Sequence, residues 1–235
     1  YAHLSDYFYI WMRRSLKAIF PELFSQTVTS KEELSTVSEY YGELPEDAQR
    51  RYATQMKTVC EKLYASAITE YPSLIFFEYH KDDDNAIRCD SIDKVCSWEV
   101  IISNLISAGF VISAVLPMRD KKVSENASTT RVLIVCRKTD ERVSGTTRRN
   151  FVSELKREFP DCLHQLLIDT DAEDRRILAM GAGLGMYSKY RKIVNADGTE
   201  MSVHDALRII VQETDEYLVQ PVDVEQGITA EIKEE

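Results

Sequence analysis

The chain has 235 residues, enough for one large domain or two small ones. Its 39 acidic residues outnumber its 29 lysines and arginines, and the net charge of −10 argues against binding nucleic acid by bulk charge. A hydrophobic content of 44% supports a packed core, and no apolar run approaches the roughly 18 residues of a membrane span. The five cysteines form no CxxC pair, so we expect reduced thiols in a cytoplasmic protein that does not contact a membrane.

The first twenty residues predict an amphipathic helix. Its apolar residues recur at a helical period, and the plain interpretation is a helix that faces the core: Leu4, Phe8, Trp11, Met12, Leu16 and Ile19. Ser5 and Asp6 stand where an N-cap and a first-turn acid are expected. Four aromatic residues crowd the start of the segment, more than a core stripe needs, so some should lie near a surface or a site: Tyr1, Tyr7, Phe8 and Tyr9.

The middle of the chain predicts an α/β pattern. A second amphipathic helix opens at Pro45, and the apolar run 73–79 is typical of a strand buried on both faces of a parallel sheet. A helix over 91–108 and a strand over 110–116 follow, which implies a right-handed parallel crossover. No helix fits before the next strand, 131–137, so we expect the last two strands to pair antiparallel.

Beyond residue 138 the pattern becomes mainly helical. We divide the chain into a first domain at 1–138, a helical region at 139–218 that begins with a polar linker, and an acidic tail at 219–235. The helical pattern from residue 148 is expected to break at Pro160. Ser202 and Asp205 resemble a capping box that opens the final helix.

The segment MGAGLGM at residues 180–186 imitates a glycine-rich nucleotide loop. A loop of that kind follows a strand and opens a helix, whereas the residues before this segment have a helical pattern. We therefore interpret the glycines as structural.

Chemistry at a strand end is expected at His80 and Lys81, because ligands of open α/β sheets bind at the carboxyl ends of strands. The loop over 117–131 shares that position, and its Arg119 suits a phosphate or a base. For both segments the alternative is a solvated loop. The run Asp82 to Asp84 lacks EF-hand spacing, so we assign no metal site.

Two basic clusters offer the places where this acidic chain would meet phosphate favourably: one holds Arg142, Arg148, Arg149, Lys156 and Arg157, and the other holds Lys189, Arg191 and Lys192. The residues we predict to contact nucleic acid are Arg148, Arg149, Lys189 and Arg191. The alternative interpretation is a solvated helix face.

The opening stretch YAHLSDYFYIWMRRSL resembles the segment that follows the catalytic DPPY motif in bacterial and archaeal adenine-specific DNA methylases that contain a zinc ribbon. Shorter matches to that family are TSKEEL at residues 29–34, the pair His80-Lys81, and YSKY at residues 187–190. The chain departs from the family pattern at residues 82–96, where an acidic insert stands.

The resemblance implies the C-terminal half of a Rossmann-like methyltransferase sheet, with parallel strands ending in an antiparallel strand, plus a mainly helical region. It implies DNA as substrate, a restriction-modification setting and S-adenosylmethionine as cofactor of the full-length protein. It also implies that the missing N-terminal half, with DPPY just before Tyr1, is the partner of this chain. The residues expected to bind substrate are Tyr1, Ser5, Asp6, His80, Lys81 and Arg119.

Neither the DPPY motif nor the family's cofactor loop, of the kind D-P-F-x-G-x-G, occurs in this sequence. We therefore assign no catalytic residue and expect the chain alone to be inactive. The alternative is a non-catalytic nucleic-acid-binding or assembly module derived from the same family.

Overall fold

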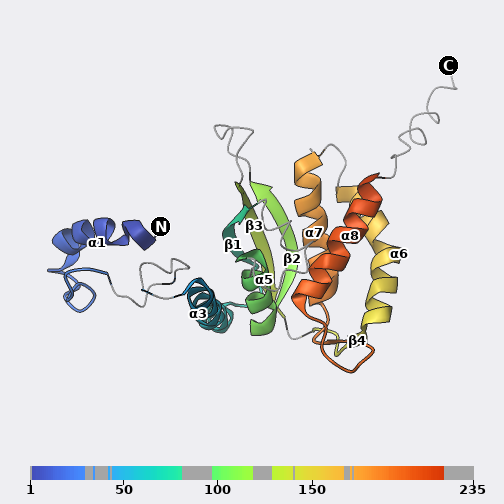
Figure 1. Ribbon diagram of the computed structural model, residues 1–235, viewed down its shortest axis with the longest axis horizontal. Helices are drawn as coiled ribbons and strands as arrows, with labels where there is room; N and C mark the ends of the chain where they lie inside the picture. The colour runs from blue at the N-terminus through green and yellow to red at the C-terminus, as the bar shows by residue number, and fades with distance from the viewer. Residues whose placement is uncertain are drawn as a thin grey trace, which may run out of the picture. The chain divides into compact units, whose positions relative to one another are not determined.

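The computed structural model describes residues 2–29, 34, 42, 44–80, 97–118, 129–139, 141–166, 170 and 172–219. The chain is a mixed α/β protein that divides into two compact units (Figure 1). The first unit comprises Tyr1–Ser66 and Val100–Ala108, and the second comprises Ala67–Glu99 and Gly109–Glu235. Within the described ranges, no helix combines the length and the apolar character that a membrane crossing requires.

Helix α1 (Ala2–Leu16) opens the first unit. Because the helix begins at Ala2, the prediction that Ser5 and Asp6 cap it is wrong, and both residues lie inside it. The Asp6 carboxylate instead accepts hydrogen bonds from the hydroxyl of Thr29 and from its backbone N–H, the latter at 2.8 Å. These two bonds hold the pKa of Asp6 below its ordinary value and tie the turns after α1 back to the helix.

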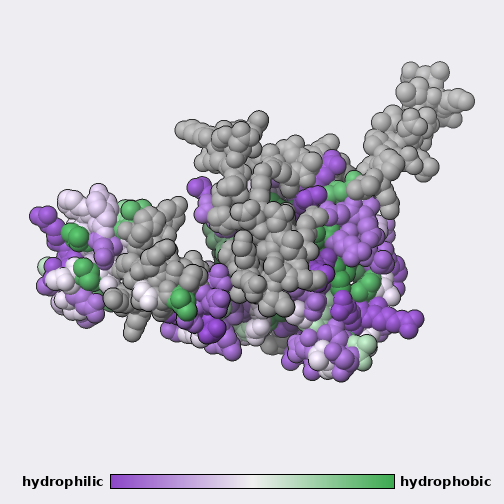
Figure 2. Space-filling view, viewed as in Figure 1, coloured by the Kyte–Doolittle hydropathy of each residue, from purple (hydrophilic) through white to green (hydrophobic). Residues whose placement is uncertain are grey.

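The prediction that α1 faces the core is also wrong. Residues 17–29 fold against one side of the helix, where Arg13 Nε donates to the carbonyl of Phe24 at 3.2 Å and the Tyr9 ring packs on that of Phe24. Large apolar side chains elsewhere on α1 are exposed: Leu4, Tyr7, Phe8, Ile10, Trp11 and Met12. Figure 2 shows green, hydrophobic atoms among purple ones on the surface of this segment.

Helix α3 (Pro45–Ser66) begins at Pro45, as predicted. Helix α5 (Ser97–Ala108) contributes its later turns to the same unit, and Asn104 Nδ2 donates to the carbonyl of Ala53 in α3 at 3.3 Å. Cys60 of α3 is fully buried, and burial raises the pKa of its thiol to about 11. A thiol with so high a pKa stays protonated at neutral pH and is a poor nucleophile.

The second unit is built on a three-stranded sheet of β1 (Ser73–His80), β3 (Thr129–Lys138) and β2 (Phe110–Met118), in that order. The central strand β3 pairs antiparallel with both neighbours, which confirms the predicted antiparallel strand. Strands β1 and β2 consequently run in the same direction, although β3 separates them.

The two faces of the sheet differ in burial. Cross-strand partners lie on the same face, and the row Phe76, Leu133 and Leu116 runs across one of them. Phe76 is 70% exposed, whereas Ile134, one residue further along β3, is fully buried on the opposite face. The prediction that β1 is buried on both faces is therefore wrong.

Helix α7 (Ala172–Ser188) packs along β2, and α8 (Val203–Val219) and α6 (Arg148–Leu166) pack on α7 (Figure 1). The glycine-rich segment lies inside α7, where a Cβ on Gly181 would lie 2.4 Å from the backbone nitrogen of Val115. A Cβ on Gly183 would collide with the side chain of Ile210 in α8. These glycines therefore serve close packing on both sides of the helix.

Three features after residue 138 test the local predictions. The expected linker over 139–147 ends in β4 (Thr146–Thr147), which pairs parallel with β5 (Ile193–Val194) and fixes that end of the segment. Helix α6 runs through Pro160 without a break. The predicted cap at Ser202 is confirmed, because Ser202 Oγ accepts the N–H of Asp205 at 3.0 Å, and the same hydroxyl donates to the Asp205 carboxylate at 2.8 Å.

Candidate functional site

One edge of the sheet gathers the strand ends that the sequence singles out. His80 ends β1 and pairs with Thr129, and Met118 ends β2 and pairs with Arg131. The carboxyl ends of β1 and β2 thus meet at the same edge, as the sequence predicts. Outside the described residues lie Tyr1, Lys81, Asp82 to Asp84 and Arg119, and so does the side chain of His80.

An aromatic cluster forms near the end of β1, where Trp98 packs against Tyr79 and Phe77. The Trp98 ring lies 5.3 Å from the ring of Tyr79, edge to face, and 5.8 Å from that of Phe77. Trp98 is only 1% exposed, and its buried indole Nε1–H has no hydrogen-bond partner among the residues that the structure describes. The residue beside it, Glu99, contacts His204 Nδ1 at 2.9 Å and so joins the start of α5 to the start of α8. The sequence gives no sign of this pair, because its members stand 105 residues apart.

Several of the predicted basic residues are already paired with acids. Lys156 pairs with Glu213 at 3.2 Å, and Arg157 pairs with Glu158 at 2.7 Å. The guanidinium of Arg142 donates to the backbone carbonyls of Ser188 and Tyr190. We therefore interpret Arg142 as a structural residue and not as a phosphate ligand. Fewer residues of the two basic clusters are therefore open to phosphate than the sequence suggests.

Lys189, one of the residues predicted to contact nucleic acid, is also paired with an acid. Its ammonium and the hydroxyl of Tyr190 both donate to the carboxylate of Glu154 on α6. Burial raises the pKa of Glu154, but the two hydrogen bonds and the positive charges of Lys189 and Arg157 together outweigh burial and hold the pKa below its ordinary value. Burial and the bond to Glu154 raise the pKa of Tyr190 to about 12. This cluster locks the end of α7 to α6 and leaves little of the Lys189 charge for another ligand.

Arg148 and Arg149 remain available. Both are exposed at the start of α6, and neither has an ion pair within the part of the chain that the structure describes. Arg191 and Lys192 are also exposed, just before β5, the strand that pairs with β4. The exposed positive charge of this region is therefore concentrated around the β4–β5 pair.

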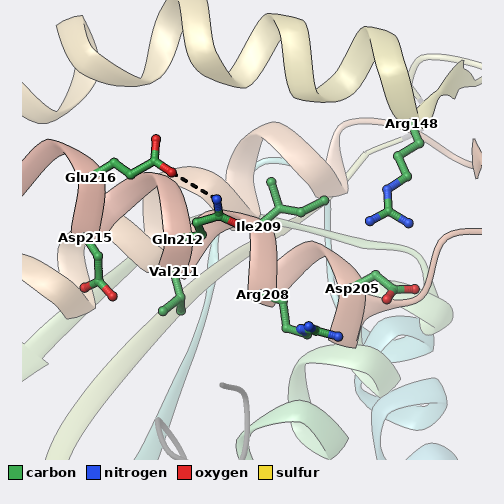
Figure 3. A pocket seen from close by; sticks show the side chains of 8 residues that line it. All are labelled: Arg148, Asp205, Arg208, Ile209, Val211, Gln212, Asp215 and Glu216. Carbon is green, nitrogen blue, oxygen red and sulfur yellow. Dashed lines mark hydrogen bonds between the residues drawn. The ribbon is translucent and has the colours of Figure 1, made fainter. Parts of the chain in front are cut away.

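A shallow pocket of about 410 Å³ opens between the start of α6 and the surface of α8 (Figure 3). Its lining residues are Arg148, Asp205, Arg208, Ile209, Val211, Gln212, Asp215 and Glu216. The acids at one end are engaged within the protein, since Asp215 pairs with Arg176 at 3.3 Å and Glu216 accepts from Gln212 at 2.9 Å. Arg148 and Arg208 lie toward the other end in Figure 3. The sequence predicts Arg148 as a binding residue and misses Arg208, which only the packing of α6 and α8 brings near it.

The glycine-rich segment does not form a site for S-adenosylmethionine. Gly181, Gly183 and Gly185 lie in the interior of a helix, and the space beside them is filled by Val115, Ile210 and the carbonyl of Ile112. A nucleotide-type loop needs backbone N–H groups open to the ligand at the start of a helix. Nor do the described residues hold any group of three histidine, cysteine or acidic side chains placed to bind a metal.

Comparison of the chain with protein-family models, curated proteins and solved structures gives no match. A proposal about function therefore depends on the motifs and on the geometry of the described residues.

Proposed function

We propose that the chain is the C-terminal portion of an S-adenosylmethionine-dependent DNA adenine methyltransferase. In this proposal the cofactor loop and the catalytic DPPY motif lie in an N-terminal half of the same protein. The present chain supplies the last strands of the methyltransferase sheet and part of the DNA-binding surface. No catalytic residue is assigned to it.

The course of the three strands is the observation that carries the proposal. The methyltransferase sheet ends in a parallel unit followed by an antiparallel strand. Strands β1 and β2 run in the same direction, α5 stands between them in the chain, and β3 is antiparallel to both. The resemblance of residues 1–16 to the segment after DPPY is independent of this course.

The exposed face of the sheet supports a missing N-terminal half. Leu74, Phe76, Leu116 and Met118 all expose apolar side chains. An antiparallel sheet can face water on one side, but the residues on that side are then usually polar, so exposed apolar side chains in these positions are typical of an interface. Strand β1 also pairs on one side only within the described residues. We expect the N-terminal half to extend the sheet at β1 and to cover this face.

The DNA-binding role is assigned to two places. The edge of the sheet where β1 ends at His80 and β2 ends at Met118 would face the target base, and Arg148 with Arg149 would contact the phosphate backbone. Exposed arginines without ion pairs can bind phosphate without breaking contacts within the protein. DNA is accordingly the partner that we propose, and the acidic character of the whole chain limits contact to these basic patches.

Calorimetric titration of this chain with S-adenosylmethionine tests the assignment of cofactor binding to the N-terminal half. We expect no tight binding, because the family's cofactor loop does not occur in the sequence and the glycine-rich segment of α7 is closely packed. Micromolar affinity for the isolated chain would overturn the assignment of the cofactor to the N-terminal half. The coding sequence upstream of Tyr1 gives a second test, since an in-frame DPPY and a glycine loop are expected there.

The second candidate is a stand-alone binding or assembly module derived from the same family. The exposed aromatic residues of α1 favour it, because they offer an interaction surface that needs no catalytic motif. A start codon directly before Tyr1 would favour this candidate over the first.

A further inference from the structure

Helix α1 has two chemically different sides. Asp6, Tyr9 and Arg13, spaced by three and four residues, lie on the side that the 17–29 segment covers. Leu4, Phe8 and Trp11 have the same spacing on the opposite side and are exposed. We name this second side, with the flanking Tyr7 and Arg14, the aromatic face: Leu4, Tyr7, Phe8, Trp11 and Arg14.

The aromatic face combines exposed rings with positive charge. Tyr7 is 61% exposed and Trp11 is 55% exposed, and the guanidinium of Arg14 lies 5.7 Å from the centre of the Trp11 ring. Arg14 follows Trp11 by three residues and Tyr7 by seven, so the three side chains stand in one row along the helix. Rings and a cation in one row are the elements with which proteins hold unpaired nucleic-acid strands.

The charge of this helix is opposite to that of the chain. Between residues 2 and 17 there is one acid, Asp6, against three basic residues, Arg13, Arg14 and Lys17, a net of +2 in a chain of −10. Asp6 lies on the covered side, where Thr29 occupies its carboxylate. The aromatic face therefore presents positive charge alone, which complements a polyanion better than it complements an ordinary apolar protein surface.

We propose that the aromatic face of α1 binds an unpaired nucleic-acid strand, whose bases stack on Tyr7 and Trp11 and whose phosphates contact Arg14. This inference rests on the proposed function and deepens it by naming the unpaired strand as the form that α1 holds. It concerns binding by this chain only. It can therefore fail while the longer protein methylates DNA, and it can hold when methylation is absent.

Titration of the 235-residue chain with single-stranded oligothymidylate provides the test, with tryptophan fluorescence and anisotropy of a labelled oligonucleotide as readouts. The chain has two tryptophans, and Trp98 is only 1% exposed, so quenching by added bases reports Trp11. We expect quenching by the single strand and weaker quenching by the matching duplex. We also expect affinity to fall as salt rises, because phosphate contacts release counterions.

Trp11→Ala should weaken oligothymidylate binding by roughly 5- to 150-fold, the effect of one lost base–aromatic stack. Trp11→Phe should retain most of the affinity, because phenylalanine also stacks. Leu23→Ala is the matched control, since Leu23 is 66% exposed but lies in the segment on the covered side, and it should change affinity by less than about twofold. Because Trp11 is exposed, its loss should leave the circular dichroism spectrum and urea midpoint of the chain unchanged.

The proposal is overturned if oligothymidylate does not quench tryptophan at low salt, or if Trp11→Ala binds as tightly as the parent chain. Analytical ultracentrifugation addresses a protein occupant. The aromatic face is a protein interface, and the proposal is wrong, if three results occur together. These are self-association of the parent chain, loss of that association in Trp11→Ala, and oligonucleotide binding that Trp11→Ala does not change.

Discussion

Replacing Gly181 by alanine should destabilise the second unit, although alanine is the better helix former. A Cβ on Gly181 would lie 2.4 Å from the backbone nitrogen of Val115 and 3.0 Å from its Cβ. Ordinary contact begins near 3.4 Å, so α7 would have to withdraw from β2 by about 1 Å, because a backbone atom cannot rotate away. The same withdrawal would stretch the hydrogen bond from the Ile112 N–H to Ser188 Oγ, which is 2.9 Å long.

The magnitude follows from three contributions. Overpacking costs about 1–3 kcal/mol, and the stretched hydrogen bond adds about 1 kcal/mol. Alanine returns about 1 kcal/mol through its helix propensity, so we expect the free energy of unfolding to fall by about 1–3 kcal/mol. Urea denaturation followed by circular dichroism measures this change.

Gly185→Ala is the matched control. It gains the same propensity, and its Cβ would meet the carbonyl oxygen of Ile112 at 3.2 Å, which requires a shift of only a few tenths of an ångström. We expect its stability to stay close to that of the parent chain. If Gly181→Ala is as stable as the parent or more stable, α7 does not approach β2 as closely as the structure places it.

Three further predictions concern buried and charged groups. Trp98→Ala should lower the free energy of unfolding by roughly 3–5 kcal/mol, and Trp98→Phe by less, because the lost Nε1–H has no partner within the described part of the chain; equal losses in urea denaturation would contradict this. The folded pKa of Glu154 lies below its ordinary value of 4.5, so its contribution to stability is complete above pH 4.5 and is lost as the pH falls through the folded value. Glu154→Gln should therefore flatten the acid decline of the urea midpoint, and an unchanged decline would count against the cluster. Changing Arg148 and Arg149 to Glu in the proposed full-length methyltransferase should weaken DNA binding about equally for all sequences, with a smaller effect at high salt; unchanged binding at low salt would return both arginines to a solvated helix face.

Local sequence signals predicted local structure well. Pro45 with the acids after it marked the start of α3, and Ser202 with Asp205 marked the start of α8. The absence of a helical pattern before residue 131 predicted the antiparallel course of β3. Each of these inferences depends on residues close together in the chain, where backbone geometry decides the outcome.

Apart from the break expected at Pro160, which lies inside α6, the failures arose where distant segments decide the outcome. The apolar run of β1 looks the same whether both faces or one face is covered, so the exposure of Phe76 was not predictable. The helical period of α1 identifies an apolar side but does not show which segment packs on it. Asp6 does not cap the helix, because its carboxylate accepts a hydrogen bond from Thr29, 23 residues away. The charge of Lys189 looked available until folding placed Glu154, 35 residues away, beside it.

Methyl transfer by the protein translated from the complete reading frame that contains this chain tests the central claim most directly. With radiolabelled S-adenosylmethionine and double-stranded DNA, we predict label on the exocyclic amine of adenine. A complete protein that is folded and binds DNA, yet transfers no methyl group to adenine, would contradict the assignment of this chain to a DNA adenine methyltransferase.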